Sequence, residues 1–283
     1  MTNKHHSIIT AILILITLAL CGCTGNKPEQ PSIVVTIEPL RYFAEQIAGD
    51  KYNVTTLVPK GSNPETYEPT AQQMMQLSNS ELFITVGNLG FERAWMKRFK
   101  ANASHMIVVD TSEGIVPIKT SPNGASDPHT WTSPANAMQI AINIYKAMAL
   151  INTKDSTYFK NNLDNLCRKI MDIDTYIDNK LKKVNHRSFI IYHPALTYFA
   201  QEYRLNQLAI EKGGREPSAA SLEQTIKEAK AKDVKLMFVQ REFANHNTEV
   251  VSKGVGAKVV EINPLSYDWE SEMKKIADEI CKQ

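Results

Sequence analysis

Short apolar runs alternate with amphipathic segments along the chain from residue 33 onward. The β-branched run 33–37 predicts a strand, and segment 39–48 predicts a helix because its apolar side chains recur three and four residues apart. The same pattern predicts strands at 54–58, 82–86 and 106–109 and helices at about 71–78 and 91–99. Strands that alternate with helices at this spacing favour a parallel α/β sheet.

A longer amphipathic segment follows a helix predicted over 135–150. Apolar residues from Phe159 to Val184 recur at three- and four-residue steps, which gives roughly 45 Å of helix at about 1.5 Å per residue. Such a helix is longer than one small lobe, so we predict that it crosses from one lobe to another. The seam of a coiled-coil dimer stays open as an alternative, although nothing of coiled-coil character flanks the segment.

The second half of the chain repeats the alternation of strands and helices. It predicts strands at 189–192, 205–210, 236–239 and 259–262, and helices at 195–202, 218–231 and 270–280. We therefore predict an α/β fold of two lobes, each a mostly parallel four-stranded sheet flanked by helices, bridged by one long rigid helix. The expected boundaries are an N-terminal lobe at 33–153, a linking helix at 154–185 and a C-terminal lobe at 186–283. Clefts between lobes are favoured ligand sites.

The N-terminus has the features of a targeting segment. The uncharged run 7–20 is too short for a mature membrane span and fits the core of a signal peptide at 1–22. Leu20 and Gly22 precede Cys23 as in a lipoprotein signal, so we predict that Cys23 is the lipid-modified first residue. A plain signal peptide cut nearby is the alternative. Residues 23–32 would be a tether, which predicts an exported protein anchored by lipid to a bacterial membrane, on its periplasmic or cell-surface side.

The composition is that of a globular protein, with 43% hydrophobic and 22% charged residues. A net charge of +2 gives no bias toward nucleic acid or an acidic partner. Cys167 lies within the long helical segment and Cys281 near the end of the chain. Their spacing is not that of a metal pair, and we do not expect a disulfide between them.

Four polar side chains stand in loops where a ligand site is expected. His129 lies in a loop stiffened by Pro128 and Pro134 at a helix entrance, and the other three candidates each follow a predicted strand. These are Glu65, His193 and Asn263. Ligands of open parallel sheets bind beyond the carboxyl ends of the strands. Imidazole suits zinc, and carboxylate oxygen suits manganese. Spacing alone does not show that the four side chains meet, so ordinary polar loop groups remain possible.

Several neighbours could support such a site. Asp127 could orient His129 or simply stabilise a turn, and Trp131 is expected to pack beneath the imidazole. Glu68 is expected to brace the Glu65 loop. Gln240 and Glu242, which follow another predicted strand, are reserve ligands.

The chain also carries a set of motifs that together are specific. They are the loop 61–69 (GSNPETYEP), Asp127-Pro128-His129-Thr130-Trp131, His193 with Tyr198-Phe199 and Tyr203-Arg204-Leu205, Glu216-Pro217-Ser218, Phe238-Val239-Gln240 and Asn263-Pro264-Leu265. Through them nearly the whole mature chain resembles the zinc- and manganese-type solute-binding lipoproteins of bacterial ABC importers, the ZnuA/TroA-like group of solute-binding protein family 9. The resemblance implies two α/β lobes bridged by one long helix, a metal held between them, and an ABC permease as partner. We expect a monomer.

Two positions depart from the family pattern. The family usually has a histidine ligand where this chain has Glu65, and often an aspartate where it has Asn263. His129 and His193 match the family directly. The predicted site is therefore Glu65, His129 and His193, completed by Asn263 or water. This set favours Zn²⁺ slightly, with Mn²⁺ as the alternative.

The predicted function is that of a receptor that captures the metal and delivers it to the permease, and not that of an enzyme. Two histidines and a glutamate with an open position also describe catalytic zinc, so a metal-dependent hydrolase is an alternative. No HExxH motif or comparable paired motif occurs in the sequence. A surface adhesin lipoprotein is the third possibility.

Overall fold

The computed structural model describes residues 30–119, 125–214, 216–243 and 246–283. The predicted signal peptide, Cys23 and residues 24–29 of the predicted tether lie outside these ranges. Residues Pro31–Gln283 form one compact unit. Within the described ranges, every helix is too short or too polar to cross a bilayer.

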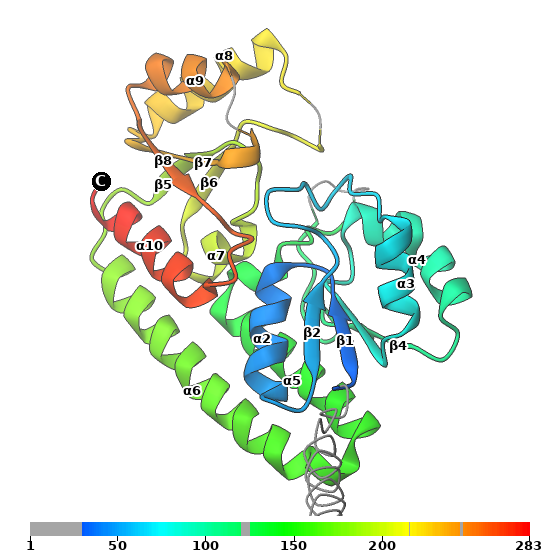
Figure 1. Cartoon of the computed structure of the whole chain (residues 1–283). Helices are drawn as coiled ribbons and strands as arrows, with labels where there is room; N and C mark the ends of the chain where they lie inside the picture. Colours follow the sequence, from blue (N-terminus) through cyan, green and yellow to red (C-terminus); the bar gives the residue numbers. More distant parts are fainter. Residues whose placement is uncertain (1–29, 120–124, 215, 244–245) are drawn as a thin grey trace, which may run out of the picture. The chain divides into compact units, whose positions relative to one another are not determined.

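The first sheet is parallel throughout, as predicted. Its strands have the order β2-β1-β3-β4 (Figure 1). They are β1 (Ser32–Val35), β2 (Asn53–Thr56), β3 (Leu82–Thr85) and β4 (Ile107–Asp110), and the helices α2 (Glu38–Ala48), α3 (Ala71–Ser78) and α4 (Gly90–Asn102) connect them. All four residues of β3 are buried, as expected for a central strand covered on both faces.

The second sheet repeats this topology with the strand order β6-β5-β7-β8, again all parallel. Its strands are β5 (Ser188–Ile191), β6 (Asn206–Ala209), β7 (Leu236–Gln240) and β8 (Lys258–Ile262). The helices of this lobe are α7 (Thr197–Glu202), α8 (Ala219–Ala231), α9 (His246–Val255) and α10 (Trp269–Cys281). The predicted fold of two four-stranded lobes is confirmed.

The bounds of several helices differ from the prediction by a few residues, and one helix was not predicted. Helix α7 begins at Thr197 instead of Ala195, because the Ala195 N–H donates to the His193 carbonyl (2.7 Å) within a turn and Leu196 is the N-cap. Helix α9 has no counterpart in the prediction. It contains Gly254, where a Cβ atom would lie 2.8 Å from the Ile226 side chain of α8, so the glycine permits close packing of the two helices.

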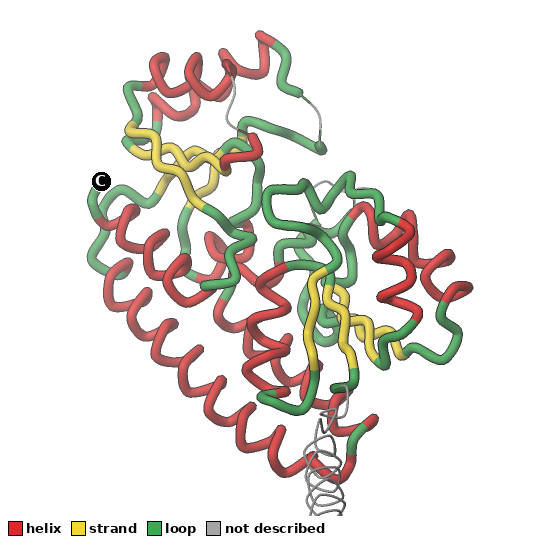
Figure 2. Tube along the Cα trace, in the orientation of Figure 1, coloured by secondary structure: helices red, strands yellow, loops and turns green. Residues whose placement is uncertain are grey.

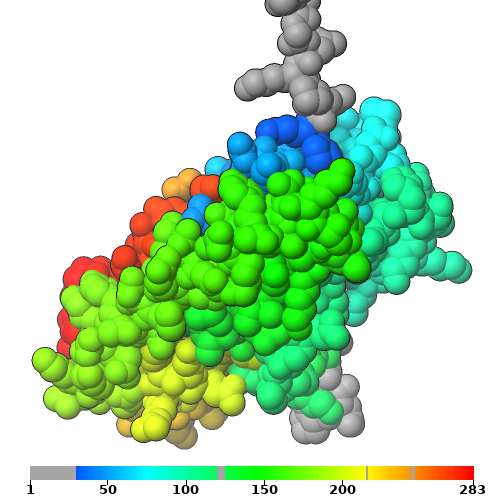
Figure 3. Space-filling view, turned by 90° about the horizontal axis from the view of Figure 1, so that it is seen from below, coloured from blue at the N-terminus to red at the C-terminus, as the bar shows by residue number. Residues whose placement is uncertain are grey.

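The long helix α6 (Ser156–Leu181) links the lobes, as predicted, and follows α5 (Pro134–Ile151). It packs against α5, α2 and α10, and so contacts both lobes. Seen from below, the green residues of α5 and α6 cover the molecule between the lobes (Figure 3). The tube trace shows α6 as one unbroken helix (Figure 2). Its apolar stripe is buried in the chain's own core. The stripe is thus used within the chain, which removes the reason to expect a coiled-coil seam.

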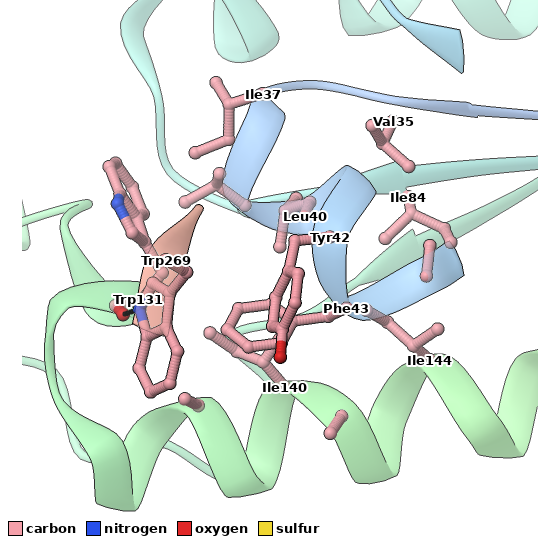
Figure 4. Packing of buried hydrophobic residues seen from close by; sticks show 14 of the residues in the cluster. Val35, Ile37, Leu40, Tyr42, Phe43, Ile84, Trp131, Ile140, Ile144 and Trp269 are labelled. Carbon is pink, nitrogen blue, oxygen red and sulfur yellow. Dashed lines mark hydrogen bonds between the residues drawn. The ribbon is translucent and has the colours of Figure 1, made fainter. Parts of the chain in front are cut away.

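Aromatic side chains fill the junction between the lobes. Trp131 and Trp269 are both 1% exposed, and Trp269 packs against Phe43 and Tyr42 of α2 (Figure 4). The Trp269 and Phe43 ring centroids are 5.2 Å apart in an edge-to-face arrangement. One hydrophobic core therefore runs through the first lobe, α6 and the inner side of the second lobe. Such a junction limits relative motion of the lobes.

No disulfide joins Cys167 to Cys281 in the part of the chain that the structure describes.

Candidate metal centre

The two predicted histidines meet at the junction of the lobes. The Nε2 atoms of His129 and His193 are 3.1 Å apart. Two nitrogens bound to one tetrahedral zinc ion at about 2.0–2.1 Å would lie about 3.3–3.4 Å apart. His129 and His193 line a cavity of about 30 Å³, and Glu65, Gln240 and Asn263 line the same cavity. This volume suits one ion or one water molecule, so the cavity can hold an ion between the two imidazoles after a small shift.

Asp127 holds the ring of His129. One oxygen of this buried carboxylate accepts hydrogen bonds from the His129 backbone N–H (2.9 Å) and from Nδ1 (2.8 Å). A proton on Nδ1 leaves the Nε2 lone pair free to face the cavity, which is the arrangement that metal-binding histidines use. Trp131 packs against the ring, with centroids 5.3 Å apart. His129 is 6% exposed, so the imidazole is both oriented and shielded.

Burial and neighbouring charges shift the pKa values of His129 and Asp127 in opposite directions. Burial would lower the pKa of His129, but the Asp127 carboxylate, with weaker help from Glu65 and Glu211, holds it above its usual value. Burial would raise the pKa of Asp127, but the charge and hydrogen bonds of His129 keep it below its usual value. The negative potential at this imidazole therefore favours a cation in the cavity.

His193 follows the end of β5 and has a carboxylate of its own. Its Nδ1 lies 3.3 Å from both oxygens of Glu211, a buried residue that follows β6. Phe243 stacks on the ring with centroids 4.7 Å apart and planes 11° apart. Glu211 was not among the residues predicted from the sequence, although it directly follows a predicted strand, which is the same signal that pointed to His193.

Glu65 lines the cavity, but its carboxylate is bound elsewhere. One oxygen accepts the Gly90 N–H (2.9 Å), and its own N–H donates to the Asn63 side chain (2.8 Å). At Gly90 a Cβ atom would lie 2.5 Å from the Glu65 carbonyl oxygen and 2.8 Å from the carboxylate. Only glycine allows the two segments to approach this closely.

The turn that presents Gly90 is held by Glu92. This fully buried carboxylate accepts hydrogen bonds from the backbone N–H groups of Val86 (2.8 Å), Gly87 (2.9 Å) and Leu89 (3.3 Å). The position of Glu65 therefore depends on a carboxylate that does not touch the cavity.

The remaining predicted residues lie at the margin or outside. Asn263 is exposed at the rim, and its side-chain oxygen accepts the Leu265 N–H (3.1 Å) within a turn. Glu68 is exposed and is not among the residues that line the cavity. The side chain of Glu242 lies outside the described part of the structure. Over the described ranges, no three His, Cys, Asp or Glu side chains are gathered closely enough to hold a metal. The two imidazoles are thus in place, whereas the carboxylate ligand is not.

Contacts from the second lobe fix the segment that carries His129. The Trp131 Nε1–H donates to the Pro264 carbonyl and the Trp269 Nε1–H donates to the Trp131 carbonyl, both at 2.7 Å; Figure 4 shows the two indoles. Tyr198 donates to the Asp127 carbonyl (3.2 Å).

The Glu202 carboxylate of α7 extends this attachment to the start of α5. It accepts hydrogen bonds from the Ser133 hydroxyl and from the Ala135 N–H, the latter at 3.1 Å. Although His129 precedes α6 in the chain, its surroundings belong largely to the second lobe.

Comparisons with known proteins agree with this architecture. Residues 33–282 match the family described as ZnuA, zinc-uptake complex component A, periplasmic. The high-affinity zinc uptake system protein ZnuA of Bacillus subtilis (strain 168) is 27% identical over 97% of this chain and 93% of its own length. A metal ABC transporter substrate-binding lipoprotein of Lactococcus lactis subsp. lactis (strain IL1403) is 26% identical over 92% of this chain and 88% of its length. A crystal structure of ZnuA superposes with a TM-score of 0.85 at 34% identity, covering 89% of this chain and 98% of that one. The chain belongs to the ZnuA family of zinc-uptake components.

Proposed function

We propose that this protein is the receptor of an ABC importer, which binds Zn²⁺ in the cavity between its lobes and delivers the ion to a permease, with Mn²⁺ as the alternative cargo. One observation carries the proposal. Two imidazoles, each backed by a carboxylate, present their Nε2 atoms to each other at 3.1 Å. The relatives support it, since one is named a zinc uptake protein and another a metal ABC transporter substrate-binding lipoprotein.

The proposed ligands are His129, His193 and Glu65, completed by water or by Asn263. For Glu65 to bind, its carboxylate must leave the Gly90 N–H and turn toward the imidazoles. Water is the better candidate for the remaining position, because the Asn263 oxygen already accepts a hydrogen bond within its turn. Two nitrogen ligands and one carboxylate favour zinc slightly over manganese.

The binding site can be tested by calorimetric titration of zinc into the full chain, purified in mild detergent and stripped of metal with a chelator. We expect one ion per chain, and we expect the double variant His129→Ala/His193→Ala to lose this binding. The matched control is His186→Ala, because the His186 side chain is 41% exposed on the surface. Zinc binding that persists unchanged in the double variant would overturn the proposed site.

Membership of this family argues against the two alternative functions, a metal-dependent hydrolase and a surface adhesin. The relatives are named as components of metal uptake. A solute-binding receptor needs no catalytic base beside its metal, whereas a zinc hydrolase does. Turnover of ester or peptide substrates by the zinc-loaded protein would revive the hydrolase hypothesis, and metal-independent binding to host surfaces would favour an adhesin.

Attachment to the membrane is proposed through a lipid on Cys23 after removal of residues 1–22. We further propose a tether at 23–32, lobes at 33–153 and 186–283, and a monomer. The lipoprotein name of the Lactococcus relative supports the anchor. Mass spectrometry of the mature N-terminal peptide tests it, since a lipidated cysteine adds a diacylglyceryl group that Cys23→Ala must lack. The molar mass of the purified protein from light scattering tests whether it is a monomer.

A further inference from the structure

Gln240 is the last residue of β7 and lines the metal cavity together with the two histidines. It is only 3% exposed. Its Oε1 atom is buried and has no hydrogen-bond partner among the described residues. A buried acceptor without a partner is destabilising, so its retention at the wall of a ligand cavity calls for an explanation.

The orientation of this amide is fixed by its other end. Its Nε2–H donates to the His193 carbonyl (2.9 Å), which also accepts the Ala195 N–H (2.7 Å). A carbonyl oxygen can only be faced by the NH₂ group, so the amide cannot turn over to satisfy Oε1. The oxygen is thereby held as a free acceptor on a residue that lines the same cavity as His193.

We infer that the Gln240 side-chain oxygen is an additional ligand of bound Mn²⁺, beyond the ligands proposed above, and so sets how well the cavity accepts Mn²⁺ relative to Zn²⁺. The inference rests on the proposed function and deepens it. A cation placed between the two imidazoles supplies what this oxygen lacks, a positive partner. Asn263 is poorly suited to the same role because its oxygen is engaged in a turn.

The chemistry of the donor explains why the effect depends on the metal. Zinc is satisfied by four ligands, so two imidazoles, Glu65 and one water are sufficient. Manganese prefers oxygen donors and a larger coordination sphere. A neutral amide oxygen therefore contributes more to manganese binding than to zinc binding.

The test compares the dissociation constants of zinc and manganese for the metal-stripped full chain and its variants by competitive titration. In Gln240→Leu, manganese binding should weaken about tenfold more than zinc binding, within the range known for residues around metal ligands. Gln240→Glu keeps an oxygen acceptor but, like the leucine variant, loses the N–H that donates to the His193 carbonyl. It should restore manganese binding if the oxygen matters, and should fail if Gln240 acts only by positioning His193.

Gln207→Leu is the matched control. Gln207 lies in the same lobe, and both ends of its amide are paired, with the Leu196 N–H and with the Thr197 hydroxyl, both at 3.0 Å. It should leave the ratio of the two dissociation constants unchanged. An equal loss for both metals in Gln240→Leu, or no loss, overturns the inference. Either result is distinct from failure of the unsubstituted protein to bind metal, which would overturn the proposed function.

Discussion

The buried carboxylate of Glu92 makes the stability of the metal-free protein depend on pH. Burial raises its pKa from the ordinary value of 4.5 to about 7, although hydrogen bonds from Thr36 and the turn after β3 favour the ionised form. This difference corresponds to about 3 kcal/mol at about 1.4 kcal/mol per pH unit. The folded state holds the proton to a higher pH than the unfolded chain does. The stabilisation is therefore fully present below about pH 4.5 and is lost as the pH rises through about 7.

The assay is urea unfolding of metal-stripped wild-type protein and Glu92→Gln across this range, with chelator present. The amide in the variant does not titrate. Its poorer fit to the surrounding hydrogen-bond donors therefore changes the free energy of unfolding by the same amount at every pH. Other groups titrate equally in both proteins and cancel. The free energy of unfolding of the wild type should thus fall relative to the variant by about 3 kcal/mol from pH 4 to pH 8. A constant difference would refute the reasoning, because it would mean that the hydrogen bonds offset the effect of burial and leave the pKa of Glu92 at its ordinary value.

Thr36→Val provides a directional control. The Thr36 hydroxyl donates to the Glu92 carboxylate at 2.6 Å and so favours its ionised form. Without it the pKa of Glu92 should rise further, and the pH-dependent loss of stability should move to higher pH.

Further predictions concern the site. Gly90→Ala places a methyl group 2.5 Å from the Glu65 carbonyl oxygen, so zinc affinity measured by calorimetry should fall about tenfold; unchanged affinity would mean that this approach is not needed. Asp127→Asn should weaken zinc binding by about 10–100-fold because the imidazole loses its orienting carboxylate, and an equal affinity would deny that role. Trp131→Phe leaves the Pro264 carbonyl unpaired and should cost about 1–3 kcal/mol of stability in urea unfolding, whereas wild-type stability would mean that this hydrogen bond does not stabilise the junction of the lobes. Zinc affinity should fall as the pH drops below neutrality, since the ligands must lose protons; a flat pH profile would argue against imidazole ligands.

The central strands of both sheets could be predicted from the sequence because they are short, mostly apolar runs that parallel sheets bury. Helix α9 could not, because Gly254 lowers its intrinsic helix propensity and is justified only by the contact with Ile226. Local patterns carry no information about such contacts.

The residues of the site could likewise be predicted only in part. His129 and His193 were recognisable from a stiff loop and a strand end, but their 3.1 Å approach depends on how the two lobes pack. The carboxylate behind His193 was not predicted, because its contact with the imidazole depends on the parallel pairing of β5 with β6. The hydrogen bond that holds the Glu65 carboxylate comes from Gly90, 25 residues along the chain, and no local spacing rule reveals it.

The attachment of the His129 segment to the second lobe has a consequence for the kinetics of ion exchange. Because the indole and carbonyl contacts of Trp131 tie this segment to the loop after β8 and to α10, the two imidazoles would form a preorganised bidentate chelate for the proposed ion. Glu65 belongs to a different loop, whose hydrogen bond runs to α4 of the first lobe. With the proposed ligands, dissociation of the ion would proceed in steps: the carboxylate would leave first, while the ion stays on the two nitrogens. Such an intermediate would lower the barrier to ligand exchange without requiring the lobes to separate.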